Sequence, residues 1–282
     1  MNDRIGIVDV GGGYRGVYAA GVLDYCLDHA LQFDVGIGVS AGSANLITYA
    51  AGQARRTHRF YTKYGLRKEY AGIKNFIFKR SFLDLDYVYS TLSDSGGEDP
   101  LDYAAAVQNP MEFVAVATEA ETGKVKYFDM RDIRQDDYSV MKASCAIPFI
   151  CRPYAVGNTL YYDGALSDPI PIEKAFQMGC DRVVLVLSLP EDTVRSSDKD
   201  MKLAARIRKK YPLAAAGLER RAEQYNAGVA LAQRYAAQGR VRIIAPDNTC
   251  GVTTLCRDAK ALNRLYRKGY CDGSRVSEFL KE

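Results

Sequence analysis

A short segment of the sequence has the residue pattern of a serine nucleophile. Gly38-Val-Ser40-Ala-Gly42 is a G-x-S-x-G pentapeptide that follows an apolar run and precedes residues compatible with a helix. A serine on such a sharp strand-to-helix turn projects its hydroxyl into a site, and the flanking glycines relieve the crowding that a Cβ would cause. The helix N-terminus adds positive potential beside the hydroxyl. The pentapeptide by itself also fits an ordinary turn between a strand and a helix.

A second segment, residues 11–16, reads GGGYRG and also lies between a predicted strand and a predicted helix. Consecutive glycines let backbone N–H groups point at one spot, where they can stabilise the oxyanion of a tetrahedral intermediate. Arg15 in this segment either reinforces the loop, meets an anionic group of the substrate or is an ordinary surface arginine. The oxyanion donors in this interpretation are the N–H groups of Gly11, Gly12, Gly13 and Ala41.

The same segment matches the G-x-G-x-x-G pattern of dinucleotide-binding proteins, which supports an alternative hypothesis. Asp34 lies near the spacing expected of the acid that binds the ribose. That acid sits at the C-terminal end of the second strand, whereas Asp34 begins its predicted strand and Ser40 ends it. A nucleotide-binding module therefore remains the alternative, and it predicts that a fluorophosphonate leaves Ser40 unlabelled.

A serine nucleophile needs a base, and the sequence has few histidines to supply one. In the usual hydrolase order the histidine follows the serine and the acid, but the later of the two histidines is His58. A triad would have to recruit His58, whereas in a dyad a carboxylate takes the proton directly. Asp163-Gly164-Ala, after the strand-like residues 159–162, is the candidate acid, although alone it would be a simple Asp-Gly turn.

Four motifs in order, GGGYRG, GVSAG, ASCAIP at 143–148 and DGA at 163–165, resemble those of the patatin-like phospholipases. The resemblance spans residues 4–190 and is greatest to small bacterial single-domain members. It implies that Ser40 is the nucleophile, Asp163 the base and the glycine loop the oxyanion hole, with Arg15 as the basic residue of that loop. The remaining matched residues, expected to shape the turns and the wall of the site, are Gly38, Gly42, Ala143, Ser144, Pro148 and Gly164.

Two small departures from the family pattern leave every reacting group in place. Val10 stands where the family often has an acidic residue, with Asp9 one position earlier, and Ala165 replaces a commoner glycine. Asp168 is expected to fix a turn. The resemblance implies a lipid acyl hydrolase of the esterase or phospholipase A type that works through an acyl-enzyme, without metal or cofactor. A non-catalytic lipid-binding relative has no support because all the reacting residues are present.

The elements that must position these residues alternate along the chain. Apolar runs at 4–10, 34–39 and 181–189 read as strands, with helices at 16–30 and 44–51 and a hairpin at 112–129. This alternation predicts a three-layer α/β/α fold with a mainly parallel sheet. Residues 55–105 read as an insertion resembling a lid. We expect residues 4–190 to form the catalytic core and 191–282 a helical extension packed on it, with a helix through Leu203, Ile207 and Tyr211, a strand at 241–245 and a helix at 259–270.

Composition and charge narrow the class of protein. The 282 residues are 48% apolar with a net charge of +4, which suits a globular domain rather than a nucleic-acid-wrapping protein. Seven cysteines without a C-x-x-C pair make a zinc site or a disulfide framework improbable. The absence of a recognisable signal or membrane span predicts a cytoplasmic protein. Nine basic against two acidic residues in 202–240 fit a solvated helix face or, as the sharper hypothesis, contact with the anionic inner face of a membrane.

Overall fold

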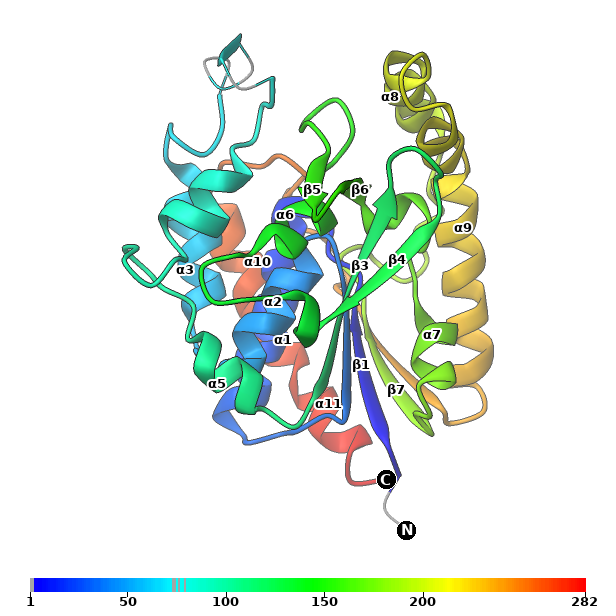
Figure 1. Cartoon of the computed structure of the whole chain (residues 1–282). Helices are drawn as coiled ribbons and strands as arrows, with labels where there is room; N and C mark the ends of the chain where they lie inside the picture. The colour runs from blue at the N-terminus through cyan, green and yellow to red at the C-terminus, as the bar shows by residue number, and fades with distance from the viewer. Residues whose placement is uncertain (1–2, 73–74, 76, 79) are drawn as a thin grey trace.

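The computed structural model describes residues 3–72, 75, 77–78 and 80–282, and a single mixed β-sheet runs through the described part (Figure 1). Its strand order is β5-β6-β3-β2-β1-β7-β8, with β4 also paired to β3. Strands β3, β2, β1, β7 and β8 run parallel, and β4, β5 and β6 are antiparallel to their neighbours. The strands are β1 Ile5–Asp9, β2 Val35–Val39, β3 Glu112–Glu119, β4 Val125–Asp129, β5 Tyr154–Val156, β6 Thr159–Asp163, β7 Arg182–Val186 and β8 Val241–Ile244.

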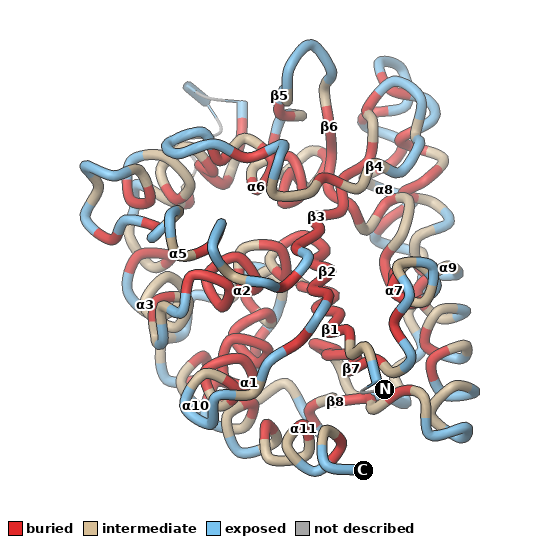
Figure 2. The backbone as a smooth tube through the Cα atoms, turned by 60° about the horizontal axis from the view of Figure 1, so that its bottom comes forward, coloured by how far each residue is buried: buried red, intermediate tan, exposed pale blue. Residues whose placement is uncertain are grey.

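Helices cover both faces of the sheet, so the predicted three-layer α/β/α architecture is confirmed. One layer holds α1, α2, α3, α5, α10 and α11, and the other holds α7 and α9, with α8 packed on α9 (Figure 2). Strand β2 is buried along its whole length because both of its faces are covered. The helices are α1 Val17–Asp28, α2 Ala41–Ala50, α3 Arg56–Thr62, α5 Tyr103–Gln108, α6 Ser139–Ser144, α7 Ile172–Gln177, α8 Asp198–Ile207, α9 Pro212–Ala236, α10 Ala259–Asp272 and α11 Ser274–Phe279.

The C-terminal part of the chain joins the sheet and its helical cover. Strand β8 pairs in parallel with β7, and α10 lies along α1. One detail of the prediction was wrong: α8 ends at Ile207, and Tyr211 precedes α9 instead of continuing the helix. Pro212 explains the break, because proline is favoured at the first position of a helix and disfavours helical backbone in the residue before it. The division of the chain at residue 190 stays a prediction.

The insertion at 55–105 is built around a buried arginine. Arg56 at the start of α3 donates hydrogen bonds to the hydroxyls of Thr48 and Ser93, at 3.2 and 2.9 Å, and to the carbonyl oxygen of Asp99 at 2.8 Å. Arg59 binds the Asp99 carboxylate through Nε and Nη2. These contacts tie α3 to the loop before α5 and hold the insertion against α2. In the described part of the chain, no helix combines the length and apolarity needed to cross a membrane.

Candidate active site

Ser40 sits on a strained turn between β2 and α2. Its φ of 55° and ψ of −130° lie in a region that non-glycine residues rarely adopt. A Cβ on Gly38 would lie 2.4 Å from the backbone N of Ser43, so only glycine lets the helix fold back this closely on the strand. The Ser40 N–H donates to the Ser144 hydroxyl at 3.0 Å, which donates to the carbonyl of Val116 at 2.7 Å. These two bonds hold the turn against β3.

The sheet register brings Asp163 to the same edge as Ser40. Val39 pairs with Val116 on β3, and the next residue of β3, Ala117, pairs with Asp163 at the end of β6. Ser40 and Asp163 thus lie on either side of β3, at the level where β2 ends. The Ser40 side chain is close enough to the Asp163 carboxylate to lower its pKa. The structure therefore brings together the two residues that the motifs singled out from positions more than a hundred residues apart in the sequence.

The Asp163 carboxylate is buried, with only 2% of the residue exposed. Burial raises its pKa above the usual range for aspartate, while the Ser40 side chain and the hydrogen bond from the N–H of Ala165, at 2.9 Å, lower it in part. The Thr118 hydroxyl donates to the Asp163 carbonyl at 2.9 Å, and Gly164 lies against the carbonyl of Val116. The result is a fixed carboxylate with more than the usual affinity for a proton.

Asp9, which lies just before the matched glycine motif, holds the glycine loop in place. The Gly11 N–H donates to Asp9 Oδ1 at 2.9 Å, and Asn45 Nδ2 donates to Asp9 Oδ2 at 2.7 Å. Burial raises the pKa of Asp9 to about 6. The sequence carried one sign of this role: Asp9 lies one position before the place where the family often has an acidic residue. Because its N–H is occupied, Gly11 positions the loop and is not a free oxyanion donor, which corrects the expectation for this residue.

The other expected donors remain free. In the described part of the chain no hydrogen bond occupies the N–H groups of Gly12 and Gly13. The N–H group of Ala41 belongs to the first turn of α2, where backbone N–H groups have no partner within the helix. Gly42, the next residue of α2, packs against the backbone of Asp9. These N–H groups come from two segments that meet beside Ser40, because Gly11 lies against the start of α2. These N–H groups can donate hydrogen bonds to an oxyanion that forms beside Ser40.

Arg15 is partly buried and is not an ordinary surface arginine. Its Nη1 donates to the Thr254 hydroxyl at 3.0 Å, and its Nε is buried without a hydrogen-bond partner. Burial, together with the nearby charges of Arg195 and Arg221, lowers the pKa of Arg15 to about 10. Neither of those two arginines was among the residues expected at the site. They come from beyond residue 190, where no motif marks them.

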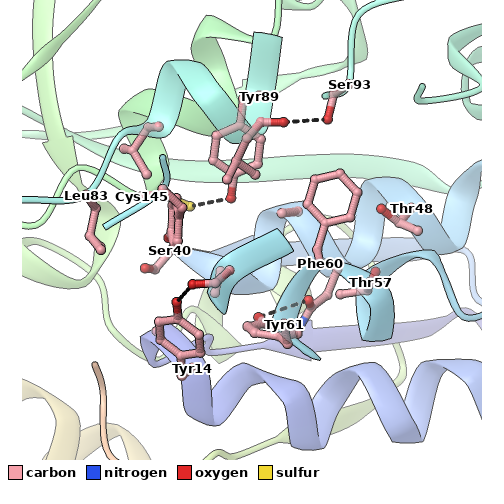
Figure 3. Close-up of a pocket in the computed structure, with 18 of the residues that line it drawn as sticks. Tyr14, Ser40, Thr48, Thr57, Phe60, Tyr61, Leu83, Tyr89, Ser93 and Cys145 are labelled. Carbon is pink, nitrogen blue, oxygen red and sulfur yellow. Dashed lines mark hydrogen bonds between the residues drawn. The ribbon is translucent and has the colours of Figure 1, made fainter. Parts of the chain in front are cut away.

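Ser40 opens into an apolar cavity that the insertion helps to form (Figure 3). Tyr89 of the insertion contacts the Cys145 sulfur at 3.2 Å, and the Tyr14 hydroxyl donates to the carbonyl of Gly65. The apolar and aromatic side chains that line the cavity are Tyr14, Phe60, Tyr61, Tyr70, Leu83, Leu85, Val88, Tyr89 and Ile147. Most of them belong to the segment 55–105, so this segment determines the shape of the cavity beside the serine.

The residues of the competing hypotheses lie elsewhere. His58 Nε2 contacts Asn263 Oδ1 at 2.9 Å, and its ring packs on Tyr266, so α3 turns it toward α10 and away from the cavity. A triad through His58 is therefore wrong. Asp34 Oδ2 accepts the N–H of Ile5 at 2.7 Å at the start of β1, the opposite end of the strand from the glycine loop. The nucleotide-binding alternative thereby loses its ribose acid.

The remaining matched residues have structural partners. Ser144, at the end of α6, bridges Ser40 and β3 as described, and Ala143 and Pro148 are buried beside it. Asp168 accepts a hydrogen bond from the Tyr127 hydroxyl at 2.6 Å, which fixes the turn after Asp163 against β4. Burial raises the pKa of Asp168 as well. These residues form the wall and the support of the site.

Two family models match separate parts of the chain. A family model described as patatin-like phospholipase matches residues 10–176, and a domain of unknown function, DUF6363, matches residues 211–282. The chain is similar to the uncharacterized protein YjjU of Escherichia coli K12, with 30% identity over an alignment 202 residues long, which covers 66% of this chain and 52% of that protein. It thus spans about half the length of this curated relative.

The fold has a counterpart among solved structures. The crystal structure of VipD from Legionella pneumophila aligns with a TM-score of 0.51 and 12% identity, covering 99% of this chain and 67% of that one. An identity this low supports the fold alone. Family membership rests on the sequence model, which spans more than half of the chain and includes both Ser40 and Asp163. The chain therefore belongs to the patatin-like phospholipase family, a family of lipid hydrolases.

Proposed function

We propose that this protein hydrolyses carboxylic ester bonds of lipids through a Ser40–Asp163 dyad. The observation that carries the proposal is the juxtaposition of Ser40, on its strained turn, and the buried Asp163, which the sheet register brings to the same edge and whose pKa the Ser40 side chain lowers. Both histidines have their contacts elsewhere, His29 with the carbonyl of Tyr25 and His58 with Asn263. Asp163 is thus the group placed to accept the serine proton.

In the proposed reaction Asp163 takes the proton of Ser40 as Oγ attacks the ester carbonyl carbon. The N–H groups of Gly12, Gly13 and Ala41 stabilise the oxyanion. When the tetrahedral intermediate collapses, the bond to the alcohol oxygen breaks, and Asp163 returns the proton to that alcohol. Water then attacks the acyl-enzyme, again losing a proton to Asp163, and the carboxylic acid leaves Ser40 with its hydroxyl restored. Burial favours the protonated form of Asp163 and so favours each transfer to it.

The cavity beside Ser40 suits the acyl part of such a substrate. Its lining of tyrosine, phenylalanine and aliphatic side chains removes apolar surface from water when a hydrocarbon chain enters. Most of that lining comes from the insertion, so we propose that residues 55–105 set the preference for acyl chains.

Labelling with a fluorophosphonate tests the proposal directly. The probe forms a covalent bond with an activated serine, so we expect one modified peptide, the one that contains Ser40, and no labelling after heat denaturation. Peptide mass spectrometry locates the modified residue. The nucleotide-binding alternative expects no labelling and a rise in melting temperature with a dinucleotide. A modified serine other than Ser40, or none, would contradict the proposed dyad.

We also propose that the end of the molecule around α8 contacts anionic membranes. Val194, four residues before α8, is 82% exposed, and so is Phe78, which lines the same cavity as Lys210 just after α8. Lys199 and Lys202 are exposed residues of α8, and α8 stands at the end where the parallel strands terminate (Figure 1). Apolar side chains that enter the lipid together with basic side chains near anionic headgroups favour such contact.

Vesicle co-sedimentation measures this contact. We expect binding to vesicles of phosphatidylcholine with phosphatidylglycerol at low salt, weaker binding at high salt, and a several-fold lower bound fraction for Phe78→Ser. Val107→Ser is the matched control because Val107 is 50% exposed but belongs to α5, far from α8 in Figure 1. The absence of binding to anionic vesicles at low salt would refute the membrane proposal.

A further inference from the structure

A chain of hydrogen bonds leads from the insertion to the glycine loop. Tyr61, near the end of α3, lines the cavity beside Ser40, and its hydroxyl donates to Asn45 Oδ1 at 3.3 Å (Figure 3). Asn45 Nδ2 in turn donates to Asp9 Oδ2 at 2.7 Å, and Asp9 Oδ1 accepts the N–H of Gly11 at 2.9 Å. The chain of bonds therefore begins at a side chain in the wall of the cavity and ends on the loop that holds the proposed oxyanion donors.

Close packing leaves the members of this chain of bonds little room to move. Asp9 and Asn45 are each 1% exposed, and Asn45 Nδ2 also donates to the carbonyl oxygen of Gly16 at 3.1 Å. A Cβ on Gly16 would lie 2.4 Å from the Tyr61 hydroxyl oxygen and 3.3 Å from the Cβ of Ala41. The hydroxyl thus packs on the last residue of the glycine segment, beside the start of α2. In an interior this dense, a displacement of Tyr61 is passed on to its neighbours.

Tyr61 also packs against the glycine segment through its ring. Tyr14 follows Gly13 in that segment, and the centres of the Tyr14 and Tyr61 rings lie 6.2 Å apart. The Tyr14 hydroxyl donates back to the carbonyl oxygen of Gly65 in the insertion. The insertion is therefore joined to the loop both by the packed rings and by the hydrogen bonds that start at the Tyr61 hydroxyl. A phenylalanine in place of Tyr61 keeps the first connection and breaks the second.

We propose that Tyr61 is a positioning residue, through which an acyl chain bound in the cavity orders the glycine loop for the reaction. An acyl chain packed against the Tyr61 ring holds its hydroxyl on Asn45 and so keeps Asp9 in place. The N–H groups of Gly12 and Gly13 then stay where the oxyanion forms. Binding energy from a part of the substrate remote from the reacting bond thereby raises kcat and does not only lower KM. The inference rests on the proposed ester hydrolysis and adds to it a dependence of kcat on the acyl chain.

Two esters with one leaving group test this role. The acyl chains of p-nitrophenyl acetate and p-nitrophenyl hexanoate differ in length, so the hexanoyl chain packs along the Tyr61 ring and the acetyl group does not. We expect the wild type to have the higher kcat on the hexanoate. Tyr61→Phe should lower that kcat about three- to tenfold, the rate equivalent of one hydrogen bond between neutral groups. Its KM for the hexanoate should change little because the phenyl ring keeps the cavity wall, and its kcat on the acetate should change little because an acetyl group does not hold Tyr61 in place.

The matched control is Tyr49→Phe. Tyr49 is a buried tyrosine of α2 whose hydroxyl donates to the carbonyl oxygen of Leu31, and it lies outside the lining of the cavity. This variant also loses one buried hydroxyl, but its kcat on both esters should match that of the wild type. An equal loss of kcat on both esters in Tyr61→Phe, or the same loss in Tyr49→Phe, would overturn the proposal. If the wild type cleaved neither ester, the proposed function itself would be wrong.

Asn45→Asp tests the next bond of the chain. It places a carboxylate oxygen at the position of Nδ2, 2.7 Å from Asp9 Oδ2, and two carboxyl groups this close restore the bond only by sharing a proton. The titratable groups around the pair are the hydroxyls of Tyr61 and Tyr14 and the thiol of Cys145, and they stay protonated because burial raises the pKa of each. On the hexanoate, kcat/KM of Asn45→Asp relative to the wild type at the same pH should therefore rise several-fold as pH falls from about 9 to about 5. A ratio that does not change with pH would overturn the proposed chain.

Discussion

Replacing Ser40 with alanine is expected to lower kcat/KM for short p-nitrophenyl esters by about 10⁴- to 10⁶-fold, as losses of the nucleophile do in other serine hydrolases. Without Oγ no acyl-enzyme can form, and only the oxyanion donors and substrate binding remain to assist the attack of water. Ser40 is almost fully buried, but the substitution removes a single oxygen atom. The fold should therefore persist, with a melting temperature close to that of the wild type.

Asp163→Asn should have an effect of similar size, because the amide keeps the shape of the carboxylate but cannot accept the serine proton. The two single variants and the double variant should be about equally inactive, since nucleophile and base act as a unit. Steady-state kinetics and circular dichroism on the three proteins provide the comparison. A folded Asp163→Asn protein with turnover close to wild type would show that another group serves as the base.

The pH dependence of this activity follows from the raised pKa of Asp163. The base must be ionised to act, so kcat/KM should fall as pH drops through the pKa of Asp163, at a higher pH than an ordinary aspartate would cause. Stability should change in the opposite sense through Asp9, whose pKa of about 6 in the folded protein exceeds the ordinary value of 3.8 that it has in the unfolded chain. Its contribution is present below the lower value and is lost as pH rises through the higher one.

Gly11→Ala is expected to lower kcat/KM by at least 10²- to 10³-fold, the usual cost of disturbing an oxyanion hole. Gly11 has a φ of +66°, and a Cβ on it would lie 2.2 Å from the carbonyl oxygen of Val39 and 3.0 Å from the N of Ala41. Neither neighbour can move away, because both are backbone atoms of the strand and the helix that flank Ser40. The loop must shift instead, and with it the N–H groups of Gly12 and Gly13.

Gly52→Ala is the control that separates the steric clash at Gly11 from the cost of placing an alanine at a positive φ. Gly52 has the same φ of +66°, but nothing lies within 4 Å of the position of its Cβ. Gly52→Ala should lose only about 1–2 kcal/mol of unfolding free energy, measured with urea, and keep its activity. Gly11→Ala should lose more stability and also its activity. If the two variants had equal kcat/KM, the glycine loop would have no part in the reaction.

Much of the fold could be predicted from the sequence because its signals are local. The apolar runs before Gly11 and Ser40 are strands β1 and β2, and Gly123 has a φ of +67° in the turn between β3 and β4. The short helix α11 and the break after Ile207 were not predicted. The break depends on a single proline inside an otherwise helical pattern of apolar residues. Helix α11 has only six residues, too few for the helical spacing of apolar residues to be recognised.

The supporting parts of the site could not be predicted in the same way. Asp9 acts through its hydrogen bond with the N–H of Gly11, and Arg195 lies close enough to Arg15 for its charge to lower the pKa of Arg15. An aspartate or an arginine at such a position is unremarkable in sequence. Their roles depend on contacts between residues up to 180 positions apart, which only the packed chain establishes.

The sequence by itself determined which residues we propose to react: a serine on a glycine-flanked turn, an acid before a glycine, and no histidine late enough in the chain to replace that acid. These are features of residue type and local backbone conformation, which short motifs record. Only the tertiary structure decided that the Gly11 N–H is occupied by Asp9, that His58 faces α10, and that arginines from beyond residue 190 lie near Arg15. Hydrogen bonds and charges act through space, and the sheet register and helix packing determine which distant residues come within their range.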